Sequence, residues 1–482
     1  MSADPLLVLQ LQRMGDLILT FPLLLALKKR WPGHPLWVAA EPQFFQELMP
    51  LAPEVVFFPP SHCPALARGT YTVVINLSGR SSAATCLADA TAAFKLGPAA
   101  SPGGLHVHGY WQLYRTALTQ NNHHNAFHWS DLYRLDLAPT VRPGQAGYML
   151  PVGAKSGRVA LVLGASEAAK RPDALFWARL AHRLAAAGFM PVFLGGPAES
   201  ALGREVARLA RLPQANLCGR LPLGEVAAVL RGVDLCISPD TGPMHLADWL
   251  GVPVLNLSMG PVHARETGPT APGQWVLRAA MSCVGCWQCR RSKLYCKLAF
   301  TPAAVARAAL AILEDPRGNR PLSRSGPLPG LSLCRTGRDA LGLYRLEALG
   351  LYRLEALEDQ AARTSPSCRV FLEDFWQAVF LFLYDSSLRP LARQRLTALQ
   401  NAFPALAQRL DAGLAGLCAR CAAAFRHQTM PADFWRGEVP LLRLFAGHTH
   451  MFLQNADFSP QGWQTTLERL TALRALFSSG AE

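Results

Sequence analysis

Short apolar runs alternate with stretches of helical periodicity over the first 150 residues. The apolar runs that fit buried strands lie at 6–11, 36–40, 55–58 and 71–77. Between the first two runs, segment 17–30 has its apolar residues at helical spacing and ends at a Trp-Pro-Gly turn. Strands that alternate with helices are typical of a doubly wound parallel sheet. We therefore predict an α/β, Rossmann-like domain over residues 1–150.

The same alternation resumes after a short linker at 151–157. Predicted strands lie at 159–163, 191–194, 217–219, 233–237 and 254–257, and predicted helices at 173–187, 198–212, 222–230 and 301–314. This pattern predicts a second Rossmann-like domain over residues 151–315. Segment 99–146 has poor periodicity and many His, Asn, Trp and Tyr residues, so we expect loops and helices there, over the carboxyl edge of the first sheet.

The remainder of the chain has a different pattern. Residues 315–340 are rich in Pro, Gly, Ser and Arg, and the octapeptide GLYRLEAL then occurs twice, at 342–349 and 350–357. A period of eight fits neither a coiled coil nor a solenoid, so we interpret the repeat as a tandem duplication and assign it no function. We predict a linker over 316–366 and, from the helical spacing of apolar residues, an α-helical domain of unknown role over 367–482.

The formal net charge of +14 over 482 residues indicates an anionic partner. No basic run with interleaved aromatic residues and no zinc-finger pattern occurs, so we expect no nucleic-acid partner. No apolar run reaches the roughly 18 residues that a membrane-spanning helix needs. Arg13 and Asp16 interrupt the first apolar run, so we expect no signal peptide and a cytoplasmic location, where the 12 cysteines stay reduced.

A strand, a turn and a helix follow one another at 233–250, and together they predict an anion-binding site. The turn Ser238-Pro239-Asp240-Thr241-Gly242-Pro243 leads into the helix, and a helix N-terminus attracts negative charge. Gly242 would let a phosphate approach the backbone, Thr241 supplies a hydroxyl, and Pro243 suits the first helical turn. Alternatively, Asp240 or Thr241 only caps the helix.

This region carries a family resemblance. Asp240-Thr241-Gly242-Pro243-Met244-His245-Leu246-Ala247, followed by Gly251-Val252-Pro253, Gly260-Pro261 and Gly268-Pro269, resembles the signature of glycosyltransferase family 9, the heptosyltransferases. The resemblance covers residues 5–315. It implies GT-B architecture, with two Rossmann-like domains and a cleft between them. The first would bind the acceptor and the second the nucleotide sugar, and the α-helical domain would follow.

The resemblance also implies an activity. The family consists of bacterial enzymes that transfer a heptose, with inversion, from ADP-heptose to the lipopolysaccharide core. We expect transfer of a heptose or related sugar from a nucleotide-diphosphate sugar to lipid A/core oligosaccharide or another cell-surface glycan. The basic surface would hold the enzyme peripherally at the inner face of the inner membrane. The alternative is a non-catalytic module that binds a nucleotide sugar, or an interaction module stabilised by metal.

Gly15-Asp16 follows the first predicted strand and matches the Gly-Asp that carries the family's catalytic base. From the residues alone, Asp16 could take a proton from an acceptor hydroxyl or could cap the first helix. The resemblance makes Asp16 the expected catalytic base. Arg13 replaces a small residue that is common in this loop, and it either contacts a phosphate of the acceptor or is a solvated charge.

The family's donor residues map onto the second predicted domain. A departing diphosphate needs positive charge, which Thr241, Gly242 and a cation would supply. Lys170 matches the family's basic residue after the first strand of that domain, although the usual tryptophan is missing and Arg171 is the rival. Glu199, in a Gly-Gly-x-x-Glu pattern, would lie near the donor ribose, or it is a first-turn helix acid. The donor-binding set is completed by Asp240, Pro243 and His245. His245 would orient the donor, or it is a histidine satisfied by a carbonyl.

Cys283, Cys286, Cys289 and Cys296 lie within a short loop. Four thiols at this spacing could remain unligated or form a structural zinc site. An iron–sulfur site fits less well, because the last gap is six residues and Lys297 follows where the bacterial ferredoxin pattern has proline. The resemblance implies that sugar transfer needs no metal. Cys418 and Cys421 lie at helical spacing, where we expect packing.

Overall fold

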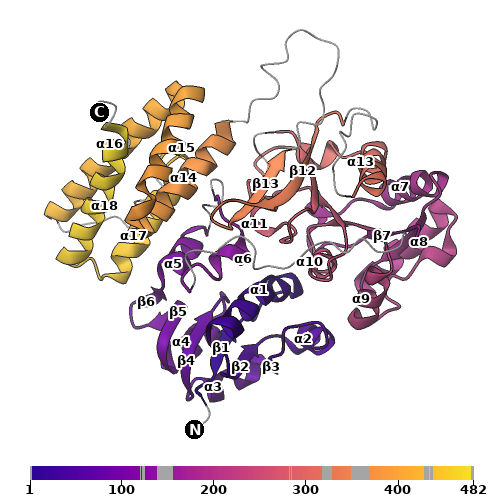
Figure 1. Ribbon diagram of the computed structural model, residues 1–482, viewed down its shortest axis with the longest axis horizontal. Coiled ribbons are helices and arrows are strands. Elements are labelled where there is room, and N and C mark those ends of the chain that lie inside the picture. The colour runs from indigo at the N-terminus through magenta and orange to yellow at the C-terminus, as the bar shows by residue number, and fades with distance from the viewer. Residues whose placement is uncertain are drawn as a thin grey trace.

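The computed structural model describes residues 3–119, 121, 125–137, 156–281, 283, 285–316, 328–348, 368–427, 434 and 438–478. Two α/β lobes and a bundle of helices make up this part of the chain (Figure 1). We call residues 3–137 the first lobe, 156–348 the second lobe and 368–478 the helical domain. The first lobe is indigo to purple, the second is magenta to salmon, and the helical domain is orange to yellow.

The first lobe is built around a parallel sheet. Its elements are β1(Leu6–Leu9), α1(Met14–Arg30), β2(Leu36–Ala39), α2(Pro42–Leu48), β3(Val56–Phe58), α3(Cys63–Leu66), β4(Thr70–Asn76), α4(Ser81–Asp89), β5(Thr91–Ser101), β6(Gly104–His108), α5(Tyr110–Ala117) and α6(Trp129–Leu132). The strand order is β3-β2-β1-β4-β5-β6, and only β6 runs antiparallel to its neighbour. Every residue of β1 is buried, as expected of a central strand with helices on both faces.

The second lobe repeats this plan. Its elements are β7(Arg158–Val162), α7(Ala174–Ala186), β8(Met190–Leu194), α8(Ser200–Ala210), α9(Leu223–Arg231), β9(Leu235–Pro239), α10(Gly242–Trp249), β10(Val254–Ser258), α11(Ala264–Thr267), β11(Trp275–Ala279), α12(Tyr295–Leu298), α13(Pro302–Glu314), β12(Leu331–Arg338) and β13(Tyr344–Ala348). The order is β13-β12-β11-β10-β9-β7-β8, with β12 and β13 antiparallel. Both lobes therefore confirm the predicted α/β class.

Three sequence predictions differ from the structure. The stretch 217–219 forms no strand, and only an isolated bridge joins Phe193 to Asn216 beside it. β5 and β6 extend into the segment expected to hold loops and helices. Residues 331–348, for which the sequence predicts a linker, form β12 and β13 at the edge of the second sheet. The first copy of the octapeptide supplies β13, and the second copy lies outside the described residues.

The helical domain consists of α14(Cys368–Tyr384), α15(Arg389–Ala402), α16(Pro404–His427), α17(Arg443–Asn455) and α18(Pro460–Ser478). Its core continues into the first lobe, because Trp111 and Tyr114 of α5 pack in one cluster with Phe380 of α14. Tyr110 Oη donates a hydrogen bond to the Phe380 carbonyl oxygen at 3.0 Å. Among the described helices, none is both long and apolar enough to cross a bilayer.

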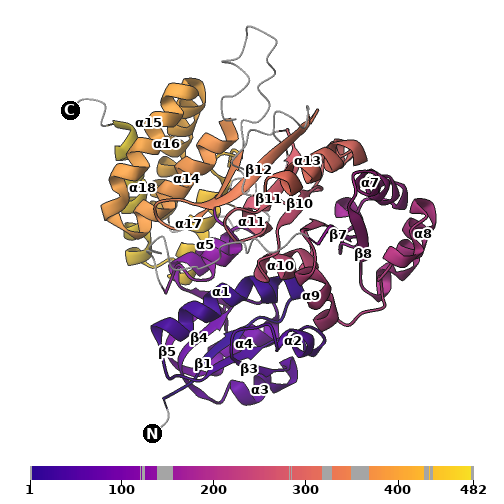
Figure 2. The same cartoon turned by 45° about the vertical axis from the view of Figure 1, so that its right-hand side comes forward.

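The helical domain also contacts the second lobe (Figure 2). Arg265 Nε of α11 lies 3.3 Å from Glu373 Oε2 of α14, and Arg345 Nη1 of β13 lies 2.5 Å from Asp374 Oδ1. The two lobes also share a hydrophobic core directly, where α1 packs against α10. Trp249 at the end of α10 donates from Nε1 to the Leu51 carbonyl oxygen of the first lobe at 2.7 Å. The lobes therefore meet along a packed seam.

Candidate functional site

The N-termini of α1 and α10 meet at the centre of this seam. A Cβ atom on Gly15 would lie 2.9 Å from His245 Cδ2, and a Cβ atom on Gly242 would collide with Met14 Cε. Each glycine therefore permits a close approach that a side chain would block. This packing brings the segment Gly15–Asp16 of the first lobe against the segment 240–245 of the second.

Asp16 lies in the first turn of α1. Its Oδ2 accepts a hydrogen bond from the Arg13 backbone N–H at 3.3 Å, so Asp16 caps its helix as well as facing the seam. Burial raises the pKa of Asp16, and Asp240 adds to this effect, whereas the Arg13 backbone bond and the charges of His245 and Arg13 oppose it. A carboxylate with a raised pKa is a better proton acceptor near neutral pH than an exposed one.

Lys170 and Asp240 form the polar centre of the second lobe, on the other side of the seam from α1. Lys170 Nζ lies 3.0 Å from Asp240 Oδ2, and both side chains are largely buried. Thr267 Oγ1 donates to the same oxygen at 3.2 Å. Lys170, rather than Arg171, is the residue that forms this ion pair. Gly260 adopts a φ of 84°, and a Cβ there would lie 3.0 Å from the Ala169 carbonyl oxygen, so glycine lets its loop pass close to Lys170.

The turn between β9 and α10 positions the remaining motif residues. Thr241 is the N-cap residue of α10, but its hydroxyl makes no capping hydrogen bond, and Pro243 occupies the first turn. The space beside Gly242 is filled by Met14 of the first lobe, so this glycine serves lobe packing here. The helix-capping alternative for the Thr241 side chain therefore does not hold in this structure.

His245 lies between the two carboxylates. Its side chain is buried, and Nε2 is 3.8 Å from Asp240 Oδ1. Within the described residues, Nδ1 has no hydrogen-bond partner, so the expected alternative of a histidine satisfied by a carbonyl is not seen for this nitrogen. Burial lowers the pKa of His245, although Asp240, Asp248 and Asp16 act in the opposite direction.

Two predicted site residues make other contacts. Glu199 Oε2 accepts a hydrogen bond from the Gly196 backbone N–H at 2.9 Å, which is the local capping role that the sequence left open. The Glu199 carboxylate also packs against Gly164, where a Cβ would lie 2.5 Å from Glu199 Cδ. Arg13 Nη1 donates to Ser166 Oγ across the seam at 3.2 Å. Arg13 therefore bridges the lobes.

Thr267 and Ser166 are polar partners that sequence reasoning missed. Both lie outside the recognised motifs, in loops or at a short helix end, and only the fold brings them to Asp240 and Arg13. Neither residue has a sequence signal that sets it apart from other hydroxyl residues of the chain.

The cysteine loop lies beside this site. Cys296 is buried and donates from Sγ to the Gly260 carbonyl oxygen at 3.5 Å, whereas Cys289 is exposed. Burial, together with the neighbouring thiols, raises the pKa of Cys286 and Cys296. The described residues contain no group of three or more His, Cys, Asp or Glu side chains arranged to hold a metal ion. In α16, Cys421 is buried in the helical core and Cys418 packs against it.

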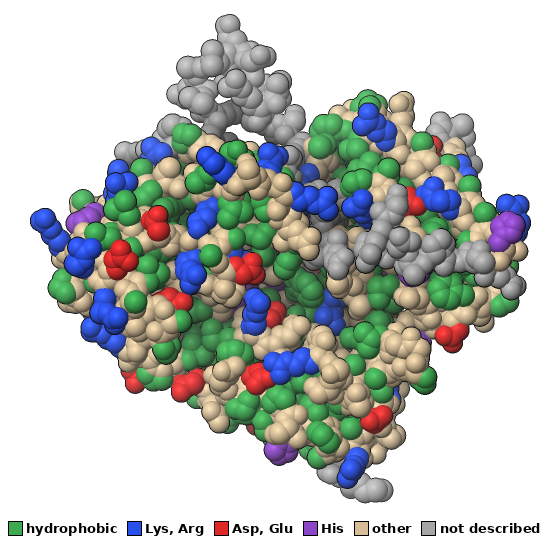
Figure 3. Space-filling model, turned by 180° about the vertical axis from the view of Figure 1, so that it is seen from behind, with side chains coloured by type: hydrophobic (Ala, Val, Ile, Leu, Met, Phe, Trp, Pro, Cys, Tyr) green, Lys and Arg blue, Asp and Glu red, His purple; other side chains and the backbone are tan. Residues whose placement is uncertain are grey.

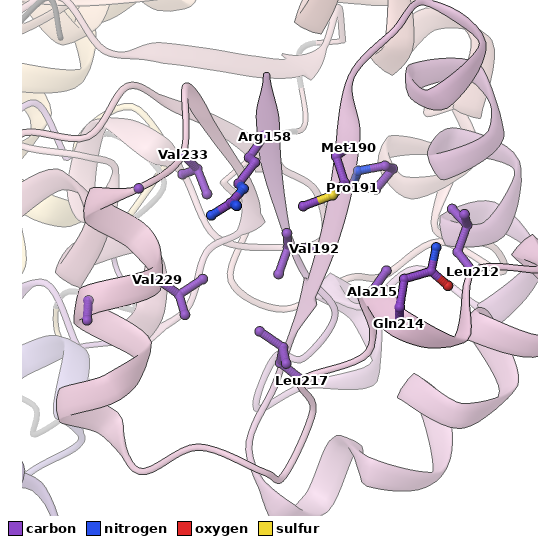
Figure 4. Close-up of a pocket in the computed structure, with 12 residues that line it drawn as sticks. Arg158, Met190, Pro191, Val192, Leu212, Gln214, Ala215, Leu217, Val229 and Val233 are labelled. Carbon is purple, nitrogen blue, oxygen red and sulfur yellow. The ribbon is translucent and has the colours of Figure 1, made fainter. Parts of the chain in front are cut away.

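A pocket of about 330 Å³ lies elsewhere in the second lobe (Figure 4). Its wall includes Arg158 and Met190, which begin β7 and β8, together with apolar side chains such as Val192 and Val229. The candidate site lies instead beyond the carboxyl ends of the strands, where open α/β sheets bind their ligands. This pocket therefore does not contain the candidate residues.

The model of glycosyltransferase family 9 (heptosyltransferase) matches residues 61–295. Residues 61–295 are therefore similar to the glycosyltransferases of family 9. The family-9 segment contains Lys170, Asp240 and His245. Asp16 and Arg13 precede it, so their assignment depends on the resemblance of the first strand and on the geometry of the seam.

Curated relatives match shorter stretches. Lipopolysaccharide heptosyltransferase 1 of Pseudomonas aeruginosa is 38% identical over 117 residues, which are 24% of this chain and 32% of that protein. Lipopolysaccharide core heptosyltransferase OpsX of Haemophilus influenzae is 34% identical over 68 residues, 14% of this chain and 20% of that protein. The matches therefore span a third or less of these two relatives.

A solved structure shows the likeness of the fold over a larger region. The crystal structure of a family-9 glycosyltransferase from Veillonella parvula superposes with a TM-score of 0.50 and 20% sequence identity. The match covers 65% of this chain and 98% of the Veillonella chain. At this identity the likeness concerns the fold alone.

Proposed function

We propose that this protein is an inverting glycosyltransferase of GT-B architecture. It would move a heptose or related sugar from a nucleotide-diphosphate sugar, such as ADP-heptose, to a lipopolysaccharide core or other cell-surface glycan acceptor. One observation carries the proposal. Asp16 in the first turn of α1 interacts electrostatically with His245 and Asp240 across the seam between the lobes, and Asp240 is in turn paired with Lys170. Residues 1–150 would bind the acceptor and residues 151–315 the donor.

The reaction follows from these positions. An acceptor hydroxyl attacks the anomeric carbon while Asp16 takes its proton, so a carbon–oxygen bond forms as the bond from carbon to diphosphate oxygen breaks. Attack from the side opposite the leaving group inverts the anomeric centre. The diphosphate gains negative charge as it leaves, and the α10 N-terminus and the Lys170 ammonium stabilise that charge.

The other predicted residues would complete the two subsites. Thr241 offers a hydroxyl that is not used in helix capping, which supports a role toward the donor. Arg13 would contact an acceptor phosphate after giving up its bond to Ser166. The proposed donor-binding set is Lys170, Glu199, Asp240, Thr241, Gly242, Pro243 and His245.

The proposed acceptor is a membrane lipid, so the protein would have to approach the membrane surface to reach it. A net charge of +14 favours an approach to anionic lipid A precursors at the inner face of the inner membrane. Lys and Arg side chains are spread over the face shown in Figure 3, with acidic ones between them. Peripheral contact would therefore depend on the summed charge, and raising the salt concentration would weaken it.

In the proposed reaction, the Lys170 ammonium and the α10 N-terminus supply the positive charge that stabilises the leaving diphosphate. The cysteine loop keeps its two leading predictions, free thiols or a structural zinc site. Metal analysis of the purified, reduced protein distinguishes them. Zinc at one equivalent per chain would support the structural site, and protein free of both zinc and iron would leave free thiols.

A specific observation favours a second candidate, the non-catalytic binding module. Met14 fills the space beside Gly242, and Glu199 is engaged in a local cap, so two donor-binding residues are occupied. The test is to incubate the purified chain with ADP-heptose and a heptose-free core acceptor, and to determine the anomeric configuration of any product. We expect a product of inverted configuration. ADP-heptose that binds but is neither transferred nor hydrolysed would favour the binding module.

A further inference from the structure

His245 has features that orienting a donor does not explain. The side chain is 6% exposed, yet Nδ1 has no partner within the described residues and Nε2 lies 3.8 Å from Asp240 Oδ1, beyond hydrogen-bond distance. A buried polar atom without a partner is costly and therefore calls for an explanation. The ring also packs against Gly15, the residue before Asp16, so His245 lies close to ionisable groups of both lobes.

Charged groups face His245 from several elements. Asp240 precedes α10, Asp248 lies one turn further along it, and Asp16 lies across the seam on α1. Lys170 follows β7, and His128 faces the imidazole from the start of α6. The carboxylates favour an imidazolium, whereas burial and the Lys170 ammonium favour the neutral ring. Burial prevails here and keeps the pKa of His245 below its usual value.

Asp248 differs from the other carboxylates in being fully engaged. It accepts hydrogen bonds from the Thr270 hydroxyl at 2.8 Å and from Gln274 Nε2 at 3.0 Å, as well as from two backbone N–H groups. Binding a donor at the seam would leave these bonds in place. Asp248 is therefore a constant influence on His245, and the variable one is Asp240.

The Lys170 ammonium currently restrains Asp240. Its Nζ at 3.0 Å and the Thr267 hydroxyl at 3.2 Å both engage Oδ2, and Oδ1 faces His245. A diphosphate at the α10 N-terminus would attract the ammonium and add its own negative charge. Both changes favour protonation of the imidazole.

We propose that His245 is a positioning residue that takes up a proton when the donor diphosphate binds, and that the resulting imidazolium keeps Asp16 as a carboxylate. The proton comes from solvent and forms one N–H bond on the ring, and no other bond changes. Asp16 is thereby prepared as a base only while a donor occupies the site. This inference rests on the proposed function, because it requires a diphosphate at the seam.

Proton uptake can be measured without knowing the acceptor. ADP binding to the full chain is followed by calorimetry near pH 7 in two buffers of different ionisation enthalpy, which gives the number of protons taken up. We expect wild type to take up a measurable fraction of a proton more than His245→Asn. The matched control is His182→Asn, an exposed histidine of α7, which should behave as wild type.

A second variant separates this mechanism from a purely structural role. In Lys170→Met the carboxylate of Asp240 has no ammonium partner, so His245 should be protonated before ADP is added. We expect this variant to lose the extra uptake although it retains the imidazole. The pH profile of transfer should also change in His245→Asn, with the acidic limb shifted to higher pH because Asp16 lacks the imidazolium.

Each outcome bears on a different part of the argument. ADP binding with equal proton uptake in wild type and His245→Asn would overturn the inference and leave the proposed function standing. If His245→Asn does not bind ADP, the wild-type data alone decide. ADP binding to wild type without net proton uptake overturns the inference. Failure of wild type to bind ADP would overturn the proposed donor site itself.

Discussion

Asp16 and Asp131 are carboxylates of the same lobe with opposite surroundings, and Asp16 is half-buried whereas Asp131 is fully buried. Asp131 accepts hydrogen bonds from Arg134 Nη2 at 2.6 Å, Arg338 Nη1 at 2.7 Å and the Tyr344 backbone N–H at 2.7 Å. For Asp16, the polar contact seen at the carboxylate is the Arg13 backbone N–H at 3.3 Å. A saturated buried carboxylate serves the fold, whereas an undersaturated one remains available for chemistry.

Their pKa values move in opposite directions for this reason. Burial alone would raise the pKa of Asp131, but Arg338 and Arg134 outweigh it and hold the pKa well below the usual range. For Asp16 burial prevails, and the pKa is raised. Asp131 also joins the lobes, because Arg338 and Tyr344 belong to β12 and β13 of the second lobe.

The largest structural effect is expected for Asp131→Asn. Removing the charge leaves Arg134 and Arg338 partly buried without their carboxylate, and breaking such a pair costs about 3–5 kcal/mol. Urea unfolding should show this loss in the free energy of unfolding. The matched control is Asp4→Asn, an exposed aspartate of the same lobe, for which we expect little change. Equal stability of the two variants would contradict the structural role of Asp131.

Lys170→Met should lower turnover strongly. It removes one source of positive charge from the proposed leaving-group site, and loss of such a group typically lowers kcat by about 10²–10³. The measurement is kcat for sugar transfer, with Arg171→Met as the neighbouring control. A larger loss of kcat in Arg171→Met would assign stabilisation of the leaving diphosphate to Arg171 instead.

The acid limit of stability should reflect Asp131. Its folded-state pKa is depressed, so its contribution is present above the unfolded value of about 3.9 and is lost as pH falls through the folded pKa. We expect the free energy of unfolding to fall between about pH 5 and 2 in wild type, with a shallower slope in Asp131→Asn. Parallel slopes would assign the acid sensitivity to other groups.

The smallest effect is expected for Asn455→Ala. The Asn455 side chain pairs with edge strand β6, accepting from the Val107 N–H at 3.0 Å and donating to its carbonyl at 2.6 Å. Its loss should cost about 1 kcal/mol in thermal or urea unfolding, without changing sugar transfer. A loss of transfer would mean that the helical domain contributes to the site beyond holding the lobe edge.

The sequence predicts the central strands and helices of both lobes, because apolar runs such as 6–11 and 254–257 are buried on both faces of a parallel sheet. It does not predict β12 and β13, whose Arg- and Gly-containing sequence reads as a linker until pairing with β11 stabilises it. Lys170, Asp240 and His245 are recognisable as motif residues. Their meeting with Asp16 depends on lobe packing through Gly15 and Met14, which local patterns do not encode.

The central claim is that Asp16 is available for chemistry in a way that Asp131 is not. Asp16→Asn should lower sugar transfer by about 10²–10⁴, as expected for loss of a general base, while ADP still binds and the free energy of unfolding stays the same or rises. Asp4→Asn should transfer as wild type does. Transfer by Asp16→Asn at the wild-type rate, with ADP bound equally well, would contradict the account.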